Sequence, residues 1–189
     1  MRADDLASLP DDLPIPIDDG ATDHLPGLAV PPIELPSTDG GAVRLDDPQA
    51  PRTVVFAYPR TGRPGEESPG GDEAWDAIPG ARGCTPQACA YRDRFAEFAA
   101  LGVRVFGLST QSTDYQREAV ERLHLPYPLL SDASLAFADA LRLPRFHQAG
   151  LTLLKRHTMV ISASRIEHVF YPVFPSDRDA ETVVEWLPR

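Results

Sequence analysis

The residues best suited to chemistry are the chain's only two cysteines, Cys84 and Cys89, which lie five positions apart. Gly83 precedes the first cysteine and a Thr-Pro pair follows it. Proline is tolerated in a first helical turn, where N–H groups have no helical partner. The pattern therefore predicts a helix that begins at Cys84, with the sulfur at the positive helix end. Amide N–H groups there, together with a nearby arginine, favour the thiolate, which is the nucleophilic form of cysteine.

The role of Cys89 is open from the residues alone, because a cysteine inside a helix is as readily a buried structural residue as a redox group. Residues five apart in an intact helix are separated by about 7.5 Å of rise and about 140° around the axis. A disulfide needs Cα atoms within about 7 Å and converging Cβ vectors. A bond between Cys84 and Cys89 would therefore require the first helical turns to unwind.

Length and charge narrow the class of protein. The 189 residues are enough for one domain with a substantial core. A net charge of −10 disfavours binding to nucleic acid or to an anionic membrane surface. No apolar run approaches membrane-spanning length and the first residues do not form an apolar signal core, so we expect a cytoplasmic protein. In that compartment two cysteines five apart indicate redox chemistry more than a structural crosslink.

Motifs for other chemistries are missing from the sequence. The five histidines have no paired ligand spacing, so a metal site is not predicted. Neither a Gly-rich phosphate loop nor a G-x-S-x-G elbow occurs, which argues against nucleotide binding and serine hydrolysis. We therefore expect no bound cofactor.

Residues 1–27 form a Pro/Asp-rich extended arm, which is either disordered or packed on the domain or a partner subunit. Residues 28–189 alternate strands and helices, an order typical of a thioredoxin-like three-layer α/β/α fold. The expected elements are a hairpin at 33–45, a buried strand at 53–58, the Cys84 helix to 101, a strand at 103–109, a helix at 113–123 opened by a Thr113–Gln116 capping box, a strand at 127–130, a helix at 135–141, a hairpin of 153–161 with 166–171, and a last helix capped by Ser176.

The segment G-C-T-P-Q-A-C-x-x-R-D resembles the active-site segment of the Q-type peroxiredoxins, the bacterioferritin-comigratory-protein group of the AhpC/TSA superfamily. The resemblance extends from about residue 28 to the C-terminus and implies a thioredoxin-like fold with an added N-terminal β-hairpin. It implies that Cys84 attacks hydrogen peroxide or an alkyl hydroperoxide and becomes a sulfenic acid. It also implies that Cys89 resolves this acid as an intramolecular disulfide, which thioredoxin or a similar dithiol reduces.

Arg156 is the expected positive partner of Cys84. The run Arg-His-Thr-Met-Val-Ile that begins at Arg156 resembles a strand of the family, of the form R-x-T-F-V-I, whose arginine lies beside the attacking cysteine. Attack on a peroxide sends negative charge onto the leaving oxygen, and a planar guanidinium can hold thiolate and peroxide with fixed donors.

The family's P-x-x-x-T-x-x-C pattern is interrupted in this chain. Pro59 matches its proline but lies 25 positions before Cys84, and an insertion at about residues 60–82 fills the gap. In the family, the threonine hydroxyl bonds the peroxide. Thr61 is the expected source of this hydroxyl if the insertion loops out, and Thr85 is the alternative.

Two other functions stay open at this point. In a one-cysteine peroxidase, Cys89 would stay buried and an external thiol would resolve the sulfenic acid. The interrupted spacing also leaves room for a non-catalytic redox sensor or binding module of thioredoxin fold. We expect a monomer or a homodimer, with a peroxide substrate and a dithiol reductant.

Overall fold

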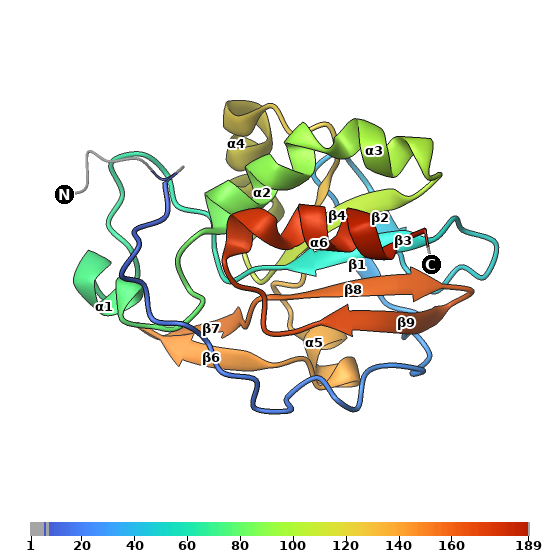
Figure 1. The fold of residues 1–189 in the computed structure, drawn as a ribbon, viewed down its shortest axis with the longest axis horizontal. Coiled ribbons are helices and arrows are strands. Elements are labelled where there is room, and N and C mark those ends of the chain that lie inside the picture. Colours follow the sequence, from blue (N-terminus) through green and yellow to red (C-terminus); the bar gives the residue numbers. More distant parts are fainter. Residues whose placement is uncertain (1–5, 7, 189) are drawn as a thin grey trace.

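The centre of the computed structural model, which describes residues 6 and 8–188, is a five-stranded mixed sheet (Figure 1). Its strand order is β5 (Leu129–Ser131), β4 (Arg104–Ser109), β3 (Thr53–Ala57), β8 (His157–Ser162) and β9 (Arg165–Phe170). Strand β3 pairs in parallel with β4 and antiparallel with β8. All of β3 is buried, as its nearly continuous apolar run predicts for a strand covered on both faces.

Helices cover the sheet on both faces (Figure 1). One face carries α2 (Cys84–Asp93), α3 (Phe95–Ala100), α4 (Thr113–Leu123) and α6 (Asp179–Trp186), and the other carries α5 (Ala136–Leu141) and the hairpin of β1 (Glu34–Pro36) and β2 (Ala42–Arg44). Alternate β3 side chains divide between the two cores, with Val54 and Phe56 facing α2 and α6, and Val55 facing α5. The predicted three-layer fold with an N-terminal hairpin is confirmed.

The single helix predicted from residue 84 to 101 is two helices. Backbone angles at Arg94, φ −102° and ψ 7°, leave the helical region and separate α2 from α3. Tyr91 and Phe98 still stack on one another across this break, with ring centroids 5.4 Å apart. Tyr91 and Phe98 are therefore both buried, although the backbone that carries them is interrupted.

Two predicted helix caps are wrong. Ser112 caps α4 in place of Thr113, because its Oγ accepts a bond from the backbone N–H three positions on, at 3.3 Å. Gln116 does not complete a capping box, because its side chain is buried. Ser176 lies inside a short 3-10 turn (Ser176–Arg178), and its hydroxyl donates to the carbonyl oxygen of Gly83 at 2.8 Å.

The strand predicted at 153–161 is also divided. Its first part is β7 (Leu151–Leu154), which pairs with β6 (Arg145–Gln148) in a separate two-stranded sheet. Lys155 and Arg156 form the connection from β7 to β8. Arg156 thus lies in the loop that enters β8, an inner strand of the main sheet, and its side chain reaches the start of α2.

The described part of the N-terminal arm packs along the domain. Leu25 is fully buried, and Asp19 accepts hydrogen bonds from Lys155 Nζ at 2.6 Å and from Tyr171 OH at 2.7 Å. These bonds, that of Lys155 first, lower the pKa of Asp19 to about 2. The arm is therefore attached to the domain at Asp19 and Leu25.

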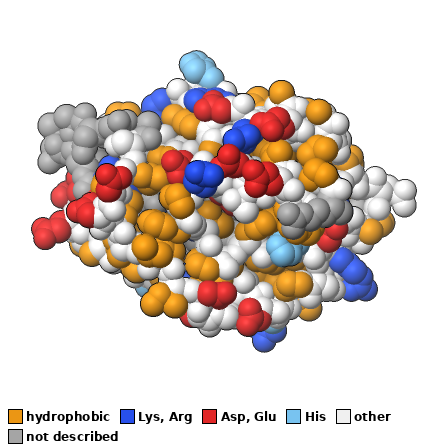
Figure 2. Space-filling view, viewed as in Figure 1, with side chains coloured by type: hydrophobic (Ala, Val, Ile, Leu, Met, Phe, Trp, Pro, Cys, Tyr) orange, Lys and Arg blue, Asp and Glu red, His pale blue; other side chains and the backbone are white. Residues whose placement is uncertain are grey.

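On the face seen in Figure 2, acidic and basic side chains are interspersed with apolar ones. Within residues 6 and 8–188, no helix has the length and apolar character needed to cross a bilayer. Over the same residues, no cluster of three or more His, Cys, Asp or Glu side chains is arranged to hold a metal ion.

Candidate active site

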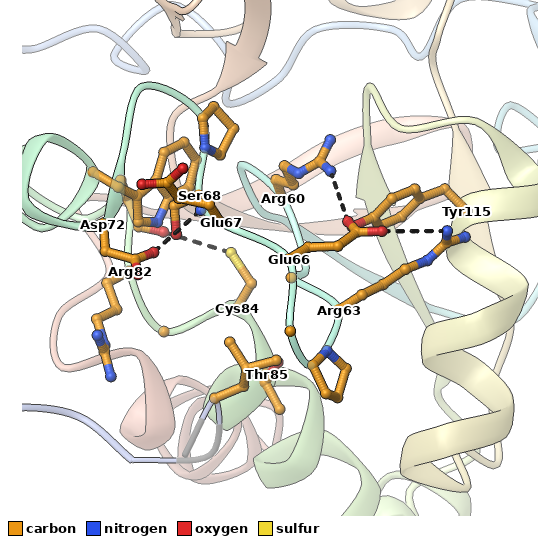
Figure 3. A pocket seen from close by; sticks show the side chains of 18 residues that line it. Arg60, Arg63, Glu66, Glu67, Ser68, Asp72, Arg82, Cys84, Thr85 and Tyr115 are labelled. Atoms are coloured by element: carbon orange, nitrogen blue, oxygen red, sulfur yellow. Dashed lines mark hydrogen bonds and ion pairs between the residues drawn. The ribbon is translucent and has the colours of Figure 1, made fainter. Parts of the chain in front are cut away.

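Cys84 is the first residue of α2, and its side chain points into a pocket (Figure 3). Gly83 precedes it with φ +104°, a backbone conformation that L side chains rarely adopt. A Cβ at this position would overlap Ser176 Oγ and lie 2.8 Å from a methyl carbon of Leu9. Only glycine fits, so the sharp entry into α2 that aims Cys84 at the pocket depends on this residue.

Arg156 brings its guanidinium directly to this sulfur, with Nη2 3.2 Å from Cys84 Sγ. The same side chain donates from Nε to the carbonyl oxygen of Gly80 at 3.3 Å, and from Nη2 to those of Ala81 and Arg82 at 3.2 Å each. It is only 3% exposed. Because a guanidinium presents its donors in a rigid fork, these bonds set its direction as well as its position. Arg156 therefore joins the end of the insertion to the sulfur of Cys84.

Behind Arg156 lies a buried polar network that begins with Gln87, one turn into α2. Arg156 Nη1 donates to Gln87 Oε1, and Gln87 Nε2 donates to Asp179 Oδ2 at 2.7 Å. Tyr91 OH and Thr158 Oγ1 donate to the same carboxylate oxygen, at 2.9 Å and 2.7 Å. Burial raises the pKa of Asp179, while the donated hydrogen bonds and the charge of Arg156 act in the opposite direction.

The insertion forms the wall of the pocket that faces Cys84 (Figure 3). Tyr115 of α4 donates from its hydroxyl to Glu66 Oε2 at 2.7 Å, and the guanidinium carbons of Arg60 and Arg63 lie 4.4 Å and 3.9 Å from the centre of its ring. Burial, with the bond to Glu66, raises the pKa of Tyr115 to about 12. The pocket volume of about 60 Å³ exceeds the roughly 10–15 Å³ that one water needs.

Trp75 anchors the middle of the insertion. It belongs to the short helix α1 (Asp72–Asp76), lines the pocket, and packs against Phe146 of β6 with ring centroids 6.3 Å apart. Gln148 Nε2, on the same hairpin, donates to the carbonyl oxygen of Pro69 at 3.2 Å. The insertion is thus held on the domain by the β6–β7 hairpin, whose existence the sequence did not predict.

The two candidate threonines have different surroundings. Thr85 lines the pocket at the second position of α2. Thr61 is buried at the start of the insertion, where its hydroxyl donates to Gln111 Oε1 at 3.1 Å. Pro59 is buried just after β3, and the described residues that line the pocket include neither Pro59 nor Thr61. Thr61 nevertheless lies between two residues that line the pocket, Arg60 and Gly62.

Cys89 is half-buried in the same helix, and both cysteines are free thiols. Burial raises the pKa of the Cys89 thiol, partly offset by the charge of Arg92. Tyr127 OH donates to the carbonyl oxygen of Ala88 at 2.6 Å, immediately before Cys89. With α2 intact, the five-residue spacing directs the sulfur of Cys89 away from that of Cys84.

Sequence reasoning missed two residues of the polar network. Gln87 could have been predicted from its spacing, because a residue three positions after Cys84 lies on the same face of the helix. Asp179 carried none, since 92 residues separate it from Gln87 in the chain. Only the packing of α6 against α2 brings this carboxylate to the site.

Comparison with known proteins then assigns the family. The Redoxin family model matches residues 25–184. Peroxiredoxin Bcp of Escherichia coli K12 is 30% identical over 165 residues, which cover 85% of this chain and 94% of that protein. The chain belongs to the peroxiredoxins. Peroxiredoxin bcp1 of Schizosaccharomyces pombe is 34% identical over 107 residues, or 56% of this chain, and the match spans 46% of that longer protein.

Solved structures agree with this assignment. Peroxidoxin BcpB of Mycobacterium tuberculosis superposes with a TM-score of 0.69 at 28% identity, covering 87% of this chain and 97% of that one. Peroxiredoxin Q of Xanthomonas campestris shares the fold, with a TM-score of 0.65 at 17% identity, over 94% of this chain and 97% of that one. These relatives identify a Q-type peroxiredoxin and therefore a thiol-dependent peroxidase. The alternative of a non-catalytic module is not supported.

Proposed function

We propose that this peroxiredoxin reduces hydrogen peroxide and alkyl hydroperoxides by a two-cysteine mechanism, in which Cys84 attacks and Cys89 resolves. The observation that carries the proposal is the 3.2 Å contact between Arg156 Nη2 and Cys84 Sγ at the first residue of α2. A buried guanidinium and a helix N-terminus both favour negative charge on that sulfur. Its pocket has room for a peroxide group.

In the first step the Cys84 thiolate attacks one peroxide oxygen, so that an S–O bond forms as the O–O bond breaks. The leaving oxygen takes up the electron pair and a proton, and departs as water or an alcohol. Arg156 stabilises the charge that develops on this oxygen, because its donors are already held in place by the insertion carbonyls. The hydroxyl of Thr85 supplies a further hydrogen bond to the peroxide.

In the second step the Cys89 thiol attacks the Cys84 sulfenic acid. The S–S bond forms, and the sulfenic oxygen leaves as water. The opening of α2 at Cys84 brings the sulfurs within bonding range, since an intact helix keeps them apart. An external dithiol, thioredoxin or a similar protein, then exchanges with the disulfide, is itself oxidised, and restores both thiols.

A one-cysteine mechanism is the second candidate, favoured by the setting of Cys89. Its side chain is half-buried in an intact helix, and burial raises the pKa of the thiol, which disfavours the nucleophilic form. In this mechanism a small external thiol condenses with the Cys84 sulfenic acid, and Cys89 stays reduced.

Intact-protein mass spectrometry after one equivalent of hydrogen peroxide separates the two mechanisms. For the two-cysteine mechanism, the reduced parent loses two hydrogens and the Cys89→Ser variant gains one oxygen. Gain of one oxygen by both would establish the one-cysteine mechanism. Cys84→Ser is the control and should gain no oxygen rapidly; a rapid gain would remove Cys84 from its proposed role.

Recycling is tested separately, by following NADPH consumption with thioredoxin and its reductase. Turnover of the parent and loss of turnover in Cys89→Ser are expected. The same assay with tert-butyl hydroperoxide tests whether alkyl hydroperoxides are accepted. Turnover with a monothiol and none with thioredoxin would contradict the dithiol part of the proposal.

A further inference from the structure

The side-chain amide of Gln87 has one favourable orientation, because one of its two neighbours can only donate hydrogen bonds and the other can only accept them. A guanidinium only donates and a carboxylate only accepts. Gln87 lies between the two, with Oε1 accepting from Arg156 Nη1 and Nε2 donating to Asp179 Oδ2 at 2.7 Å. If the amide were reversed, its NH₂ group would face the guanidinium, and two sets of donors would oppose one another.

Asp179 is well placed to hold this direction. It is 3% exposed at the start of α6, and its Oδ2 also accepts bonds from Tyr91 OH at 2.9 Å and Thr158 Oγ1 at 2.7 Å. Tyr91 lies one turn beyond Gln87 on α2, and Thr158 lies on β8, two residues after Arg156. One carboxylate oxygen therefore ties the helix that carries Cys84 to the strand that follows the arginine.

Filling this space with a buried carboxylate is energetically unfavourable. Its desolvation is unfavourable, and burial accordingly raises the pKa of Asp179. Well-packed apolar side chains often stabilise a core as well as buried charges do, whereas buried ionic groups can specify one arrangement over another. The specific arrangement here is the one that points Arg156 at the sulfur.

We propose that Asp179 is a positioning residue for the peroxidase reaction: it orients the Gln87 amide, which orients the Arg156 guanidinium toward Cys84. Asp179 has no hydrogen bond to the sulfur and does not line the pocket, and its hydrogen-bonded connection to Arg156 runs through Gln87. The inference rests on the proposed role of Cys84 as the attacking thiol.

The test measures the second-order rate constant for oxidation of Cys84 by hydrogen peroxide, by stopped-flow fluorescence. Trp75 lines the pocket and serves as the reporter. Loss of the acceptor in Asp179→Ala should slow oxidation by about 10-fold or more, the usual scale for losing a hydrogen bond that involves a charged group. Asp179→Asn keeps an acceptor oxygen and should stay within about 3-fold of the parent.

Exchanging the amide and the carboxylate between positions 87 and 179 distinguishes a role in positioning Arg156 from a role in stabilising the fold. Gln87→Glu places two carboxylates across the 2.7 Å contact and should slow oxidation by about 10-fold or more. Combining it with Asp179→Asn gives the new carboxylate an NH₂ donor, so that each contact along residues 156, 87 and 179 again joins a donor to an acceptor, and the neighbouring Tyr91 and Thr158 hydroxyls are also able to accept. The double variant should recover to within about 3-fold of the parent, since Arg156 again has a fixed acceptor.

Glu185→Ala is the matched control, because this acidic residue lies exposed on the same helix α6. Its rate should equal that of the parent. Thermal melting of every variant shows whether it is folded, and if Asp179→Ala does not fold, the exchange between positions 87 and 179 carries the test alone.

Two results would overturn the inference. The first is a parental rate in folded Asp179→Ala, and the second is a double variant that regains its melting temperature without regaining its rate. Either result leaves Cys84 as the attacking thiol. If instead the parent itself does not react faster than Cys84→Ser, the proposed function fails and not only the role of Asp179.

Discussion

Arg156 Nη2 lies 3.2 Å from Cys84 Sγ, although 72 residues separate the two in the chain. The contact depends on three elements that meet at this point: the loop before β8, the N-terminus of α2, and the end of the insertion. Each of these elements is held by its own buried interactions, so the sulfur and the guanidinium face one another before any peroxide is bound. Such preorganisation is the usual source of electrostatic catalysis.

Arg156→Lys should slow oxidation of Cys84 by about 100-fold or more, the scale seen when a preorganised donor to a developing charge is removed. Lysine keeps the positive charge but cannot donate to the insertion carbonyls and the sulfur through one rigid fork. Stopped-flow oxidation by hydrogen peroxide measures the effect. Arg117→Lys is the matched control: that side chain is exposed on α4, pairs with Asp114 at 2.7 Å, and does not line the pocket, so its rate should be unchanged. Equal rates for the parent and Arg156→Lys would contradict the assignment.

Gly83→Ala should lower the free energy of unfolding by about 2–4 kcal/mol, because a strained positive φ and a steric overlap act together. The added Cβ would meet Ser176 Oγ and Leu9. Gly102→Ala measures the backbone strain without the overlap, since φ there is also positive, at +67°, and no atom lies within 4 Å of the added Cβ. Urea denaturation of the two variants gives the comparison. A loss no larger at Gly83 than at Gly102 would show that the surroundings of Gly83 relax without cost.

Tyr127→Phe should speed the resolving step by about 2- to 10-fold, the effect of losing one ordinary hydrogen bond from the intact helix. The lost bond runs to the carbonyl oxygen of Ala88 and holds α2 folded between the two cysteines. Quenched-flow trapping of the disulfide measures the rate. The first oxidation of Cys84 should not change, which serves as the internal control. Slower disulfide formation in the variant would show that Tyr127 assists the opening of α2.

His157 should make the fold sensitive to mild acid. It is fully buried on β8, its Nε2 has no hydrogen-bond partner within the described residues, and burial lowers the pKa of the imidazole to about 4. Between that value and an unfolded pKa near 6.5 the unfolded chain binds more protons. The contribution of His157 to the free energy of unfolding should therefore be fully present above pH 6.5 and be lost as the pH falls toward 4, by about 3 kcal/mol in all.

His157→Asn tests this pH dependence. The asparagine NH₂ group replaces the donor that now bonds the carbonyl oxygen of Lys155 at 2.8 Å, but does not titrate in this range. Urea unfolding at pH 7.5 and pH 5 gives the change in the free energy of unfolding with pH for the parent and for the variant. The difference between these two changes is the contribution of His157. Other buried groups, such as Asp179, titrate in both proteins and cancel. The same pH dependence in both proteins would remove His157 as its source.

Local rules of the chain predicted much of the site. Glycine before Cys84 and Thr-Pro after it predicted where α2 begins, because the requirements of a helix N-terminus are met within a few residues. The buried strand β3 followed from its apolar run, and the family motif singled out Arg156. These are properties of short segments, and neighbouring residues in the chain are sufficient to determine them.

Only the tertiary structure decided which distant side chains meet Cys84. It placed Thr85 among the residues that line the pocket and Thr61 in a hydrogen bond with Gln111. It also brought Asp179 to the polar network from the start of α6. Such contacts depend on how helices pack on the sheet and where a long insertion is anchored. No local spacing encodes these choices, since each is the outcome of burying surfaces from separate parts of the chain.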